Sequence, residues 1–439
     1  MVFASLPFVI WFLPATVLLH ELAPKRVKNA ALLLISVFFY AWGEPRFLPV
    51  IVGSVLVNYA SARLSESMPE LWRRVVFYAT ITINLAALVI CKTAFSPDSM
   101  PLGISFYTFQ SMAYVIDVYR RKSKTERNLV DYAAFIMLFP QLIAGPIVLY
   151  ESVREDLRGR IVTAEDREAG ISLFIIGLAS KTLLANPLGQ IWVAVQRQAL
   201  PSAPLRWIGI IAFGLQIYYD FAGYSQMAIG MGRMLGFRFP QNFNMPYAAC
   251  SVRDFWRRWH MTLGAWFREY VYIPLGGNRR GSLRTVINLI IVWSLTGLWH
   301  GAHANFLAWG LWFCAFLLLE RFFIGEWLKK HRAAAWVYAQ LVVLLGWVLF
   351  SLDSLPLSLS YAAGMFTAKG GADWQFLLRG NAVLLAVAVL FCVPKVCAFI
   401  RRCMERRTAL RVACLFVLLG LNVASLVNAG YNPFLYFRF

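Results

Sequence analysis

Apolar residues recur in long runs from one end of the chain to the other, and the polar residues between them form only short connections. A helix that crosses a bilayer needs about 20 mostly apolar residues, so runs near that length are candidate spans. The longest polar stretches, Glu151–Glu168 and Asp353–Gly380, are too short to form a soluble domain. We therefore expect residues 1–439 to form a single membrane domain. Thirteen apolar segments stand out: 4–22, 29–43, 47–62, 75–95, 102–119, 132–150, 169–195, 206–235, 285–303, 304–324, 334–352, 380–400 and 409–429.

Two of the thirteen segments are not expected to cross the membrane. Residues 47–62 are short, and residues 132–150 are interrupted by Pro140, Gly145 and Pro146. Glycine and proline at membrane depth are typical of re-entrant or broken helices. The pattern therefore predicts an all-α polytopic membrane protein with about eleven transmembrane helices, together with re-entrant and interfacial helices.

The composition agrees with a membrane protein. Hydrophobic residues make up 59% of the chain and charged residues only 15%, whereas a soluble domain has about 25% charged residues. Seven cysteines form no Cys-x-x-Cys pair, so neither a disulfide framework nor a metal site is expected. The sequence contains no Gly-x-Ser-x-Gly elbow, His-Glu-x-x-His helix or P-loop. These absences argue against a serine hydrolase, a zinc protease and a nucleotide-binding loop.

Charge along the chain predicts the orientation of the spans. The chain has 42 Lys and Arg against 22 Asp and Glu, a net charge of +20. No basic stretch is interleaved with aromatic residues in a polar context, so nucleic acid is not an expected partner. Placing the basic clusters in the cytoplasm, by the positive-inside rule, puts both termini outside it. Between residues 150 and 285 the topology stays open. The clusters are Lys25, Arg26 and Lys28; Arg120, Arg121, Lys122, Lys124 and Arg127; and Arg401, Arg402, Arg406, Arg407 and Arg411.

One stretch, Ser251–Gly277, is too polar to span a membrane and too aromatic for a solvated loop. Two interpretations remain open. It is either an interfacial helix anchored by tryptophans or an internal polar layer around His260. Its charged residues, Asp254, Arg257, Arg258, Arg268 and Glu269, are interspersed with Trp256, Trp259 and Trp266.

A histidine lies at the end of a later apolar run. Val286–Trp299 carries no charge and leads directly into His300. Ionisable groups at membrane depth are costly and usually face a cavity or a partner. His260, His300 and His303 are three of only five histidines in the chain. On a continuous helix His303 would share a face with His300.

A buried histidine supports two kinds of function. It can take a proton from a hydroxyl that attacks a thioester and later return that proton, which is acyl transfer without a protein nucleophile. It can also relay protons in a transporter, although the hydropathy pattern has no obvious inverted repeat. The residues alone leave both an enzyme and a transporter open.

Several motifs resemble the membrane-bound O-acyltransferase family, in particular its bacterial branch that includes the alginate O-acetyltransferase membrane subunit. The central match is Arg253-Asp254-Phe255-Trp256-Arg257-Arg258-Trp259-His260-Met261-Thr262-Leu263, followed by Trp266-Phe267-Arg268-Glu269-Tyr270-Val271-Tyr272-Ile273-Pro274-Leu275-Gly276-Gly277-Asn278 and by Leu298-Trp299-His300-Gly301-Ala302. Further matches lie at 103–110, 116–120, 145–146 and 220–225. The resemblance therefore covers nearly the whole chain.

The resemblance implies a multi-helix enzyme of the bacterial inner membrane, with a tunnel that joins a cytoplasmic donor to an extracytoplasmic acceptor. His300 matches the principal catalytic histidine of the family, and His260 matches a position where a hydrogen-bonding side chain donates or orients. The implied donor is acetyl-CoA, with no bound cofactor. The implied partners are a separate periplasmic protein of the SGNH-hydrolase type, a polysaccharide-modifying complex and membrane lipid.

The polymer is expected to be alginate or a similar polysaccharide, with cellulose, peptidoglycan and teichoic acid as alternatives. A non-catalytic scaffold is a further alternative. For Arg257 and Arg258 the alternative to donor contact is an ion pair with Asp254 or Glu269. For Asp220, Tyr224 and Gln110 the alternative is a buried structural hydrogen bond. The residues expected to contact substrate are Asp254, Trp256, Arg257, Arg258, Trp299, Asp220, Tyr224 and Gln110.

Overall fold

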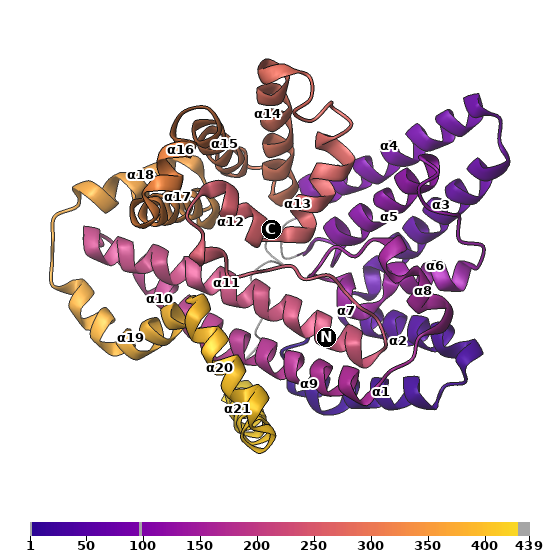
Figure 1. Cartoon of the computed structure of the whole chain (residues 1–439), viewed down its shortest axis with the longest axis horizontal. Coiled ribbons are helices and arrows are strands. Elements are labelled where there is room, and N and C mark those ends of the chain that lie inside the picture. Colours follow the sequence, from indigo (N-terminus) through magenta and orange to yellow (C-terminus); the bar gives the residue numbers. More distant parts are fainter. Residues whose placement is uncertain (1, 96–98, 429–439) are drawn as a thin grey trace. The chain divides into compact units, whose positions relative to one another are not determined.

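The computed structural model describes residues 2–95 and 99–428, and within these ranges all regular structure is helical (Figure 1). The helices of the first half are α1 Leu13–Leu22, α2 Lys28–Gly43, α3 Leu48–Ser67, α4 Glu70–Ala94, α5 Ile104–Tyr119, α6 Leu129–Met137, α7 Phe139–Leu142, α8 Tyr150–Gly159, α9 Ala164–Ala179, α10 Asn186–Gln196 and α11 Ala203–Met234. Those of the second half are α12 Val252–Arg258, α13 Met261–Phe267, α14 Gly281–His300, α15 Ala304–Leu319, α16 Gly325–Lys330, α17 Arg332–Ser351, α18 Leu355–Thr367, α19 Asp373–Leu390, α20 Pro394–Arg406 and α21 Thr408–Asn428.

Eight helical segments among the described residues are long and apolar enough to cross a membrane. The all-α polytopic membrane class predicted from the sequence is thus confirmed. The eight are fewer than the eleven expected, partly because apolar helices such as α2 and α5 have only 16 residues each. The eight segments are Pro45–Ser67, Glu70–Ala94, Ala164–Gln196, Gly281–His300, Ala304–Lys330, Arg332–Ser351, Asp373–Leu390 and Thr408–Asn428.

The two segments that were not expected to cross the membrane, 47–62 and 132–150, differ in structure. Residues 132–150 do not form one helix, since α6, α7 and irregular backbone share them. Residues 47–62 are not too short, because they lie in a helical segment of 23 residues, Pro45–Ser67, which is long and apolar enough to cross a membrane. The apolar run ends at Ala62, but the helix continues through the more polar residues up to Ser67. Proline is tolerated at the beginning of that helix because the first-turn N–H groups have no helical partner.

The chain divides into two compact units. The first comprises Met1–Leu178, Tyr224–Gln241 and Leu426–Phe439, and the second comprises Ala179–Gly223 and Asn242–Ser425. In the first unit α5 packs against α3, α4 and α6 and is buried from Ile104 to Val118. The centre of the first unit is therefore α5, a helix enclosed on every side.

In the second unit α14 and α15 form the most closely packed helix pair. Glycine allows this approach: a Cβ atom on Gly297 would lie 2.4 Å from the carbonyl oxygen of Phe306. A Cβ on Gly310 would lie 2.2 Å from the carbonyl oxygen of Trp293. Because His300 is the last residue of α14, the packing of this pair determines where its imidazole lies.

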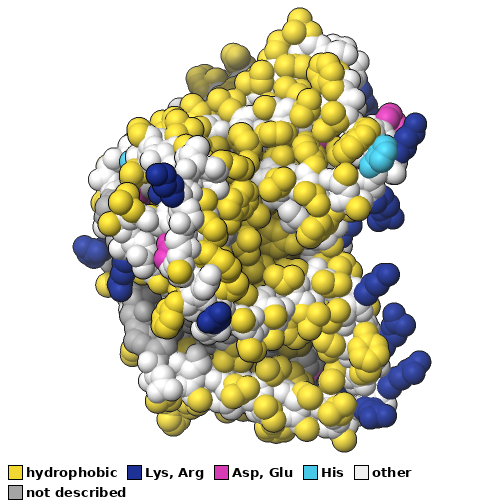
Figure 2. All heavy atoms as spheres, turned by 90° about the vertical axis from the view of Figure 1, so that its left-hand side faces the viewer, with side chains coloured by type: hydrophobic (Ala, Val, Ile, Leu, Met, Phe, Trp, Pro, Cys, Tyr) yellow, Lys and Arg dark blue, Asp and Glu magenta, His cyan; other side chains and the backbone are white. Residues whose placement is uncertain are grey.

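Many large apolar side chains lie on the surface, as is expected where helices face lipid. Figure 2 shows a face on which hydrophobic side chains cover most of the area. The span that contains α19 contributes strongly to this character, since Phe376 is 87% and Val383 is 79% exposed. Such exposed apolar side chains on a long helix are stable in lipid and would be an aggregation hazard in water.

Candidate active site

The polar and aromatic stretch Ser251–Gly277 folds as two short helices with a sharp change of direction between them. Helix α12 ends at Arg258 and α13 begins at Met261. His260 lies at the break with φ +43°, in the left-handed region. Left-handed backbone at a residue other than glycine costs roughly 1–3 kcal/mol and is found mainly at functional sites. The surroundings of His260 must therefore stabilise this conformation.

The N-terminus of α12 is fully hydrogen-bonded. A helix begins with four N–H groups that lack a helical acceptor. The N–H groups of Val252 and Arg253 donate to the Glu320 carboxylate, at 2.5 and 3.0 Å. Those of the next two residues donate to the hydroxyl and the carbonyl oxygen of Ser251. Glu320 is 7% exposed, so a buried carboxylate anchors the helix that leads to His260.

Asn242 holds the other side of the break. Its side-chain oxygen lies 3.0 Å from Nδ1 of His260 and accepts the Thr262 hydroxyl at 2.8 Å and the Thr262 N–H at 3.3 Å. Its backbone carbonyl oxygen accepts the N–H of Met261. A single buried amide thus fixes the histidine and caps the beginning of α13.

His260 is enclosed by aromatic rings. Its imidazole meets Phe221 edge to face at 4.7 Å between ring centroids, Phe243 at 6.4 Å and Trp299 at 6.1 Å. Burial lowers the pKa of His260 to about 3. The cause is desolvation, because a charged imidazolium is poorly accommodated among apolar rings. The imidazole is therefore neutral at physiological pH.

His300 occupies a similar aromatic environment at the end of α14. Its ring lies 4.8 Å from that of Trp299, 4.9 Å from Trp309 and 5.1 Å from Phe350. His300 is buried, whereas His303 is exposed. The helix ends at His300, and His303 precedes α15, so the two histidines do not share a helix face.

Trp299 connects the two histidines, since its indole is in ring contact with both. Trp256 reaches the same cluster through Trp309, at 5.5 Å between ring centroids. The buried indole N–H groups of Trp256 and Trp309 have no acceptor among the described residues. The structure thus brings together His260, His300, Trp299 and Trp256 in one aromatic cluster of the second unit.

The charged residues of α12 separate into two groups. The Nε atom of the Arg258 guanidinium lies 3.0 Å from both carboxylate oxygens of Asp254, in an ion pair whose side chains are 32% and 37% exposed. This is the ion pair that the sequence offered as an alternative to donor contact. Arg257 is exposed.

Asp220 is buried in an ion pair within the second unit. Its Oδ1 lies 2.6 Å from Nζ of Lys181, with both side chains no more than 5% exposed. A buried carboxylate needs such a partner because the cost of removing its charge from water is high. The next residue after Asp220 is Phe221, whose ring packs against His260. The ion pair therefore helps to hold Phe221 in place beside the histidine.

Gln110 and Tyr224 belong to the first unit. Gln110 lies on α5 with no exposed surface, and neither polar atom of its side chain has a hydrogen-bond partner among the described residues. Tyr224 is 2% exposed and stacks on Phe3 at 4.6 Å between ring centroids. Both side chains are interior.

Sequence reasoning missed three residues that shape the site: Asn242, Lys181 and Glu320. A signal for two of them was present, because Lys181 and Glu320 are ionisable residues inside long apolar helical segments. Such residues mark functional or paired positions. Asn242 carried no such signal, since it lies in an irregular connection and its role depends on the fold.

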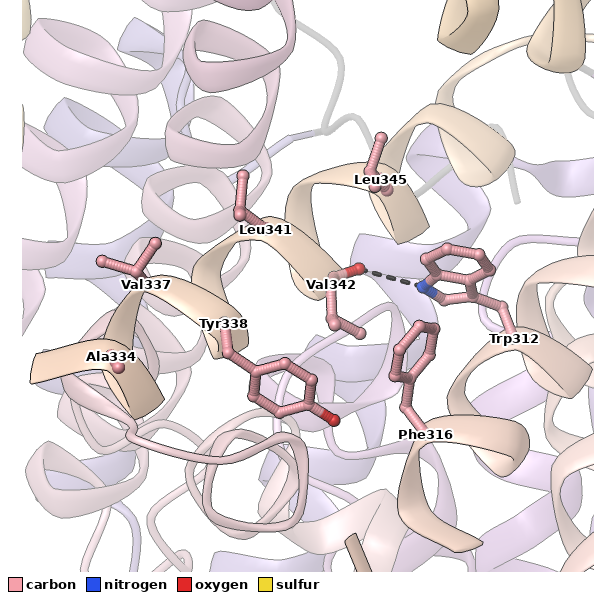
Figure 3. Close-up of a pocket in the computed structure, with 8 residues that line it drawn as sticks. All are labelled: Trp312, Phe316, Ala334, Val337, Tyr338, Leu341, Val342 and Leu345. Carbon is pink, nitrogen blue, oxygen red and sulfur yellow. Dashed lines mark hydrogen bonds between the residues drawn. The ribbon is translucent and has the colours of Figure 1, made fainter. Parts of the chain in front are cut away.

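A separate apolar groove lies between α15 and α17 (Figure 3). Trp312 and Phe316 line one side, and residues of α17 from Ala334 to Leu345 line the other. The Trp312 indole N–H donates to the carbonyl oxygen of Val342 at 2.9 Å. The lining contains no histidine or carboxylate, so the groove is not where the proton chemistry is expected.

Comparison with known proteins identifies the family. The membrane-bound O-acyltransferase family matches residues 72–360. The chain belongs to this family. The match includes both histidines, Asn242 and Glu320, and family membership makes the protein an O-acyltransferase of multi-pass membrane type.

The relatives differ in the polymer that their names imply. A probable alginate O-acetylase, AlgI, of Pseudomonas putida is 34% identical, and the match covers 100% of both chains. A peptidoglycan O-acetyltransferase of Helicobacter pylori is 30% identical over 98% of this chain and 96% of its own. A teichoic acid D-alanyltransferase of Streptococcus thermophilus is 26% identical over 64% of this chain and 71% of its own. The names of these three relatives thus refer to three different polymers.

Proposed function

We propose that this protein transfers an acetyl group from acetyl-CoA on the cytoplasmic side to an extracytoplasmic acceptor, for the O-acetylation of alginate or an alginate-like polysaccharide. The observation that carries the proposal is the contact of one indole, Trp299, with two buried histidines: His300 at the end of α14 and His260 at the break between α12 and α13. An O-acetylase relative that matches the full chain supports acetyl as the acyl group.

In the proposed reaction His300 acts as the general base. It takes the proton of the acceptor hydroxyl while the oxygen bonds to the carbonyl carbon of the thioester. The tetrahedral intermediate then collapses, the carbon–sulfur bond breaks, and the leaving thiolate receives the proton from His300. Atoms and charges balance without a protein nucleophile or a metal ion.

Alginate is the polymer we favour as the final acceptor. A partner protein is needed to pass the acetyl group on to this polymer. Export of an acetyl group to a long polymer requires a protein that grips the polymer outside the membrane. We infer a separate periplasmic acetyltransferase of the SGNH type, within a polysaccharide-modifying complex in the inner membrane. Removing that partner should abolish acetylation of the polymer while the membrane protein persists.

The decisive experiment compares wild-type protein with His300→Ala. Proteoliposomes are supplied with acetyl-CoA and an acceptor hydroxyl, and both free CoA and acetyl ester are measured. We expect wild-type protein to produce both in equal amounts and His300→Ala to produce neither above background. His303→Ala is the matched control, since that histidine is exposed and three positions away.

The alternatives predict other results. A proton-coupled transporter would move a solute or protons without releasing CoA. A scaffold would support normal polymer acetylation in cells when His300 is replaced by Ala. Analysis of acetyl esters on the alginate, cellulose and peptidoglycan of the producing cell would identify the polymer.

A further inference from the structure

The side chain of Asn242 determines which nitrogen of His260 carries the proton. Amide oxygen and nitrogen are hard to tell apart by shape, so their assignment depends on the hydrogen-bond network. Here the backbone N–H of Thr262 points at the same Asn242 atom that meets His260, at 3.3 Å. A backbone N–H can only donate. The Asn242 atom must therefore be the oxygen.

The tautomer of His260 follows from that assignment. The Asn242 oxygen accepts hydrogen bonds and cannot donate one, and it lies 3.0 Å from Nδ1 of His260. Nδ1 must therefore carry the hydrogen. In a neutral imidazole the other nitrogen then bears the lone pair. Among the described residues, the aromatic rings of Phe221, Phe243 and Trp299 lie against His260.

We propose that Asn242 is a positioning residue that holds His260 as the Nδ1–H tautomer, so that Nε2 bears the lone pair and can accept a hydrogen bond but cannot donate one. This differs from the donor role that the sequence suggested for His260. The orienting role is retained, but Nε2 acts as an acceptor and not as a donor. The oxyanion of the tetrahedral intermediate must then be stabilised by another group.

The arrangement resembles, in physical terms, a carboxylate that orients a catalytic histidine, with an amide in place of the acid. A carboxylate would stabilise the imidazolium, whereas a neutral amide selects the tautomer with little added stabilisation of the charge. An asparagine is therefore suited to keep His260 neutral while fixing its direction. The use of Nε2 rests on the proposed acyl transfer, but the tautomer itself does not.

The tautomer can be measured without any activity assay. Full-length protein labelled with ¹⁵N in the histidine rings has only five histidines, and the His260 resonances are assigned by their loss in His260→Asn. Solid-state NMR in lipid near pH 7 should show a protonated Nδ1 and an unprotonated Nε2 for His260. A protonated Nε2 with a bare Nδ1 would overturn the proposal, whether or not the protein transfers acetyl groups.

A variant pair tests the positioning role. Asn242→Asp keeps an acceptor for both Thr262 and His260 but adds a negative charge, which raises the pKa of His260. We expect a new acid limb in its pH–rate profile between about pH 5 and 7. Thr262→Val removes the other side-chain hydrogen bond to the same oxygen and should keep the wild-type profile. Superimposable pH–rate profiles for Asn242→Asp and wild type would contradict the positioning role of Asn242. A wild-type protein without transfer activity would instead count against the proposed acyl transfer.

Discussion

The Glu320 carboxylate accepts the backbone N–H of Val252 at 2.5 Å, across 68 positions of sequence. Glu320 begins a π-helical turn, Glu320–Ile324, that interrupts the helical segment Ala304–Lys330. Its second oxygen accepts the N–H of Arg253. A costly buried acid is thus used to hold the first turn of α12, and α12 leads directly into His260. The position of one catalytic candidate therefore depends on a residue in a different helix.

Replacing Glu320 should impair both stability and transfer. Glu320→Leu leaves the buried N–H of Val252 without an acceptor, at about 1–3 kcal/mol, and removes the acceptor of the part-buried Arg253 N–H at a smaller cost. Glu320→Gln retains one accepting oxygen and should lie between Leu and wild type. Since a displacement of about 1 Å at a catalytic group can cost up to about 100-fold in rate, CoA release should fall in the same order.

Thermal unfolding in detergent and CoA release measure the two effects of Glu320. The matched control is Glu326→Gln, because Glu326 is six residues away and forms an exposed ion pair with Lys329. If Glu320→Leu melts and reacts like Glu326→Gln, then the carboxylate does not hold α12.

The Lys181–Asp220 ion pair should be strongly coupled. Breaking a buried pair by removing one partner leaves an uncompensated charge and costs about 3–5 kcal/mol. We expect Asp220→Leu and Lys181→Met each to destabilise the protein, and the combination of these two substitutions to recover most of the loss. The exposed pair Arg63–Glu66 is the control, and Glu66→Gln should change stability by less than about 1 kcal/mol.

A double-mutant cycle on thermal unfolding tests this coupling. Losses that simply add in the double variant would contradict a direct interaction between Lys181 and Asp220. If the single variants fold but lose transfer far beyond their loss of stability, Asp220 contacts substrate as the sequence analysis expected.

The close approach of α14 and α15 should tolerate no added methyl group. A Cβ on Gly310 would lie 2.2 Å from the Trp293 carbonyl oxygen, and that backbone atom cannot move aside cheaply. We expect Gly310→Ala to destabilise by about 1–3 kcal/mol through overpacking and to lower transfer by displacing His300. Gly380→Ala is the control, because nothing lies within 4 Å of that Cβ position, and it should be neutral or slightly stabilising. Equal melting temperatures for the two variants would contradict the tight packing.

The membrane class and the motif histidines could be predicted from sequence because both depend on local signals. Hydropathy over about 20 residues marks a span without knowledge of its neighbours. His260 and His300 stood out because ionisable residues are rare in so apolar a chain. The ion pair of Arg258 could also be anticipated from sequence, because Asp254 lies four positions before it and residues at this spacing share a helix face.

The supporting residues could not be predicted because their roles depend on distant contacts. Glu320 acts on Val252 and Asn242 acts on His260 only after the chain has folded. The spacing of His300 and His303 suggested a shared helix face, but α14 ends at His300. Helix ends depend on capping and on tertiary contacts, which a periodic pattern does not contain.

The buried neutral state of His260 should make stability depend on pH. Burial lowers its pKa to about 3, whereas in the unfolded chain a histidine titrates near 6.5. Below pH 6.5 the unfolded state therefore binds a proton that the folded state does not, and stability falls as the pH decreases toward 3. The contribution is up to about 1.4 kcal/mol for each pH unit.

His260→Asn removes this pH-dependent contribution, so the melting temperature of this variant should fall less steeply between pH 6.5 and 4.5 than that of wild type. His331→Asn is the matched control, since His331 is exposed, and it should retain the wild-type slope. A His260→Asn slope equal to that of wild type would mean that the folded protein binds a proton at His260 as readily as the unfolded chain does.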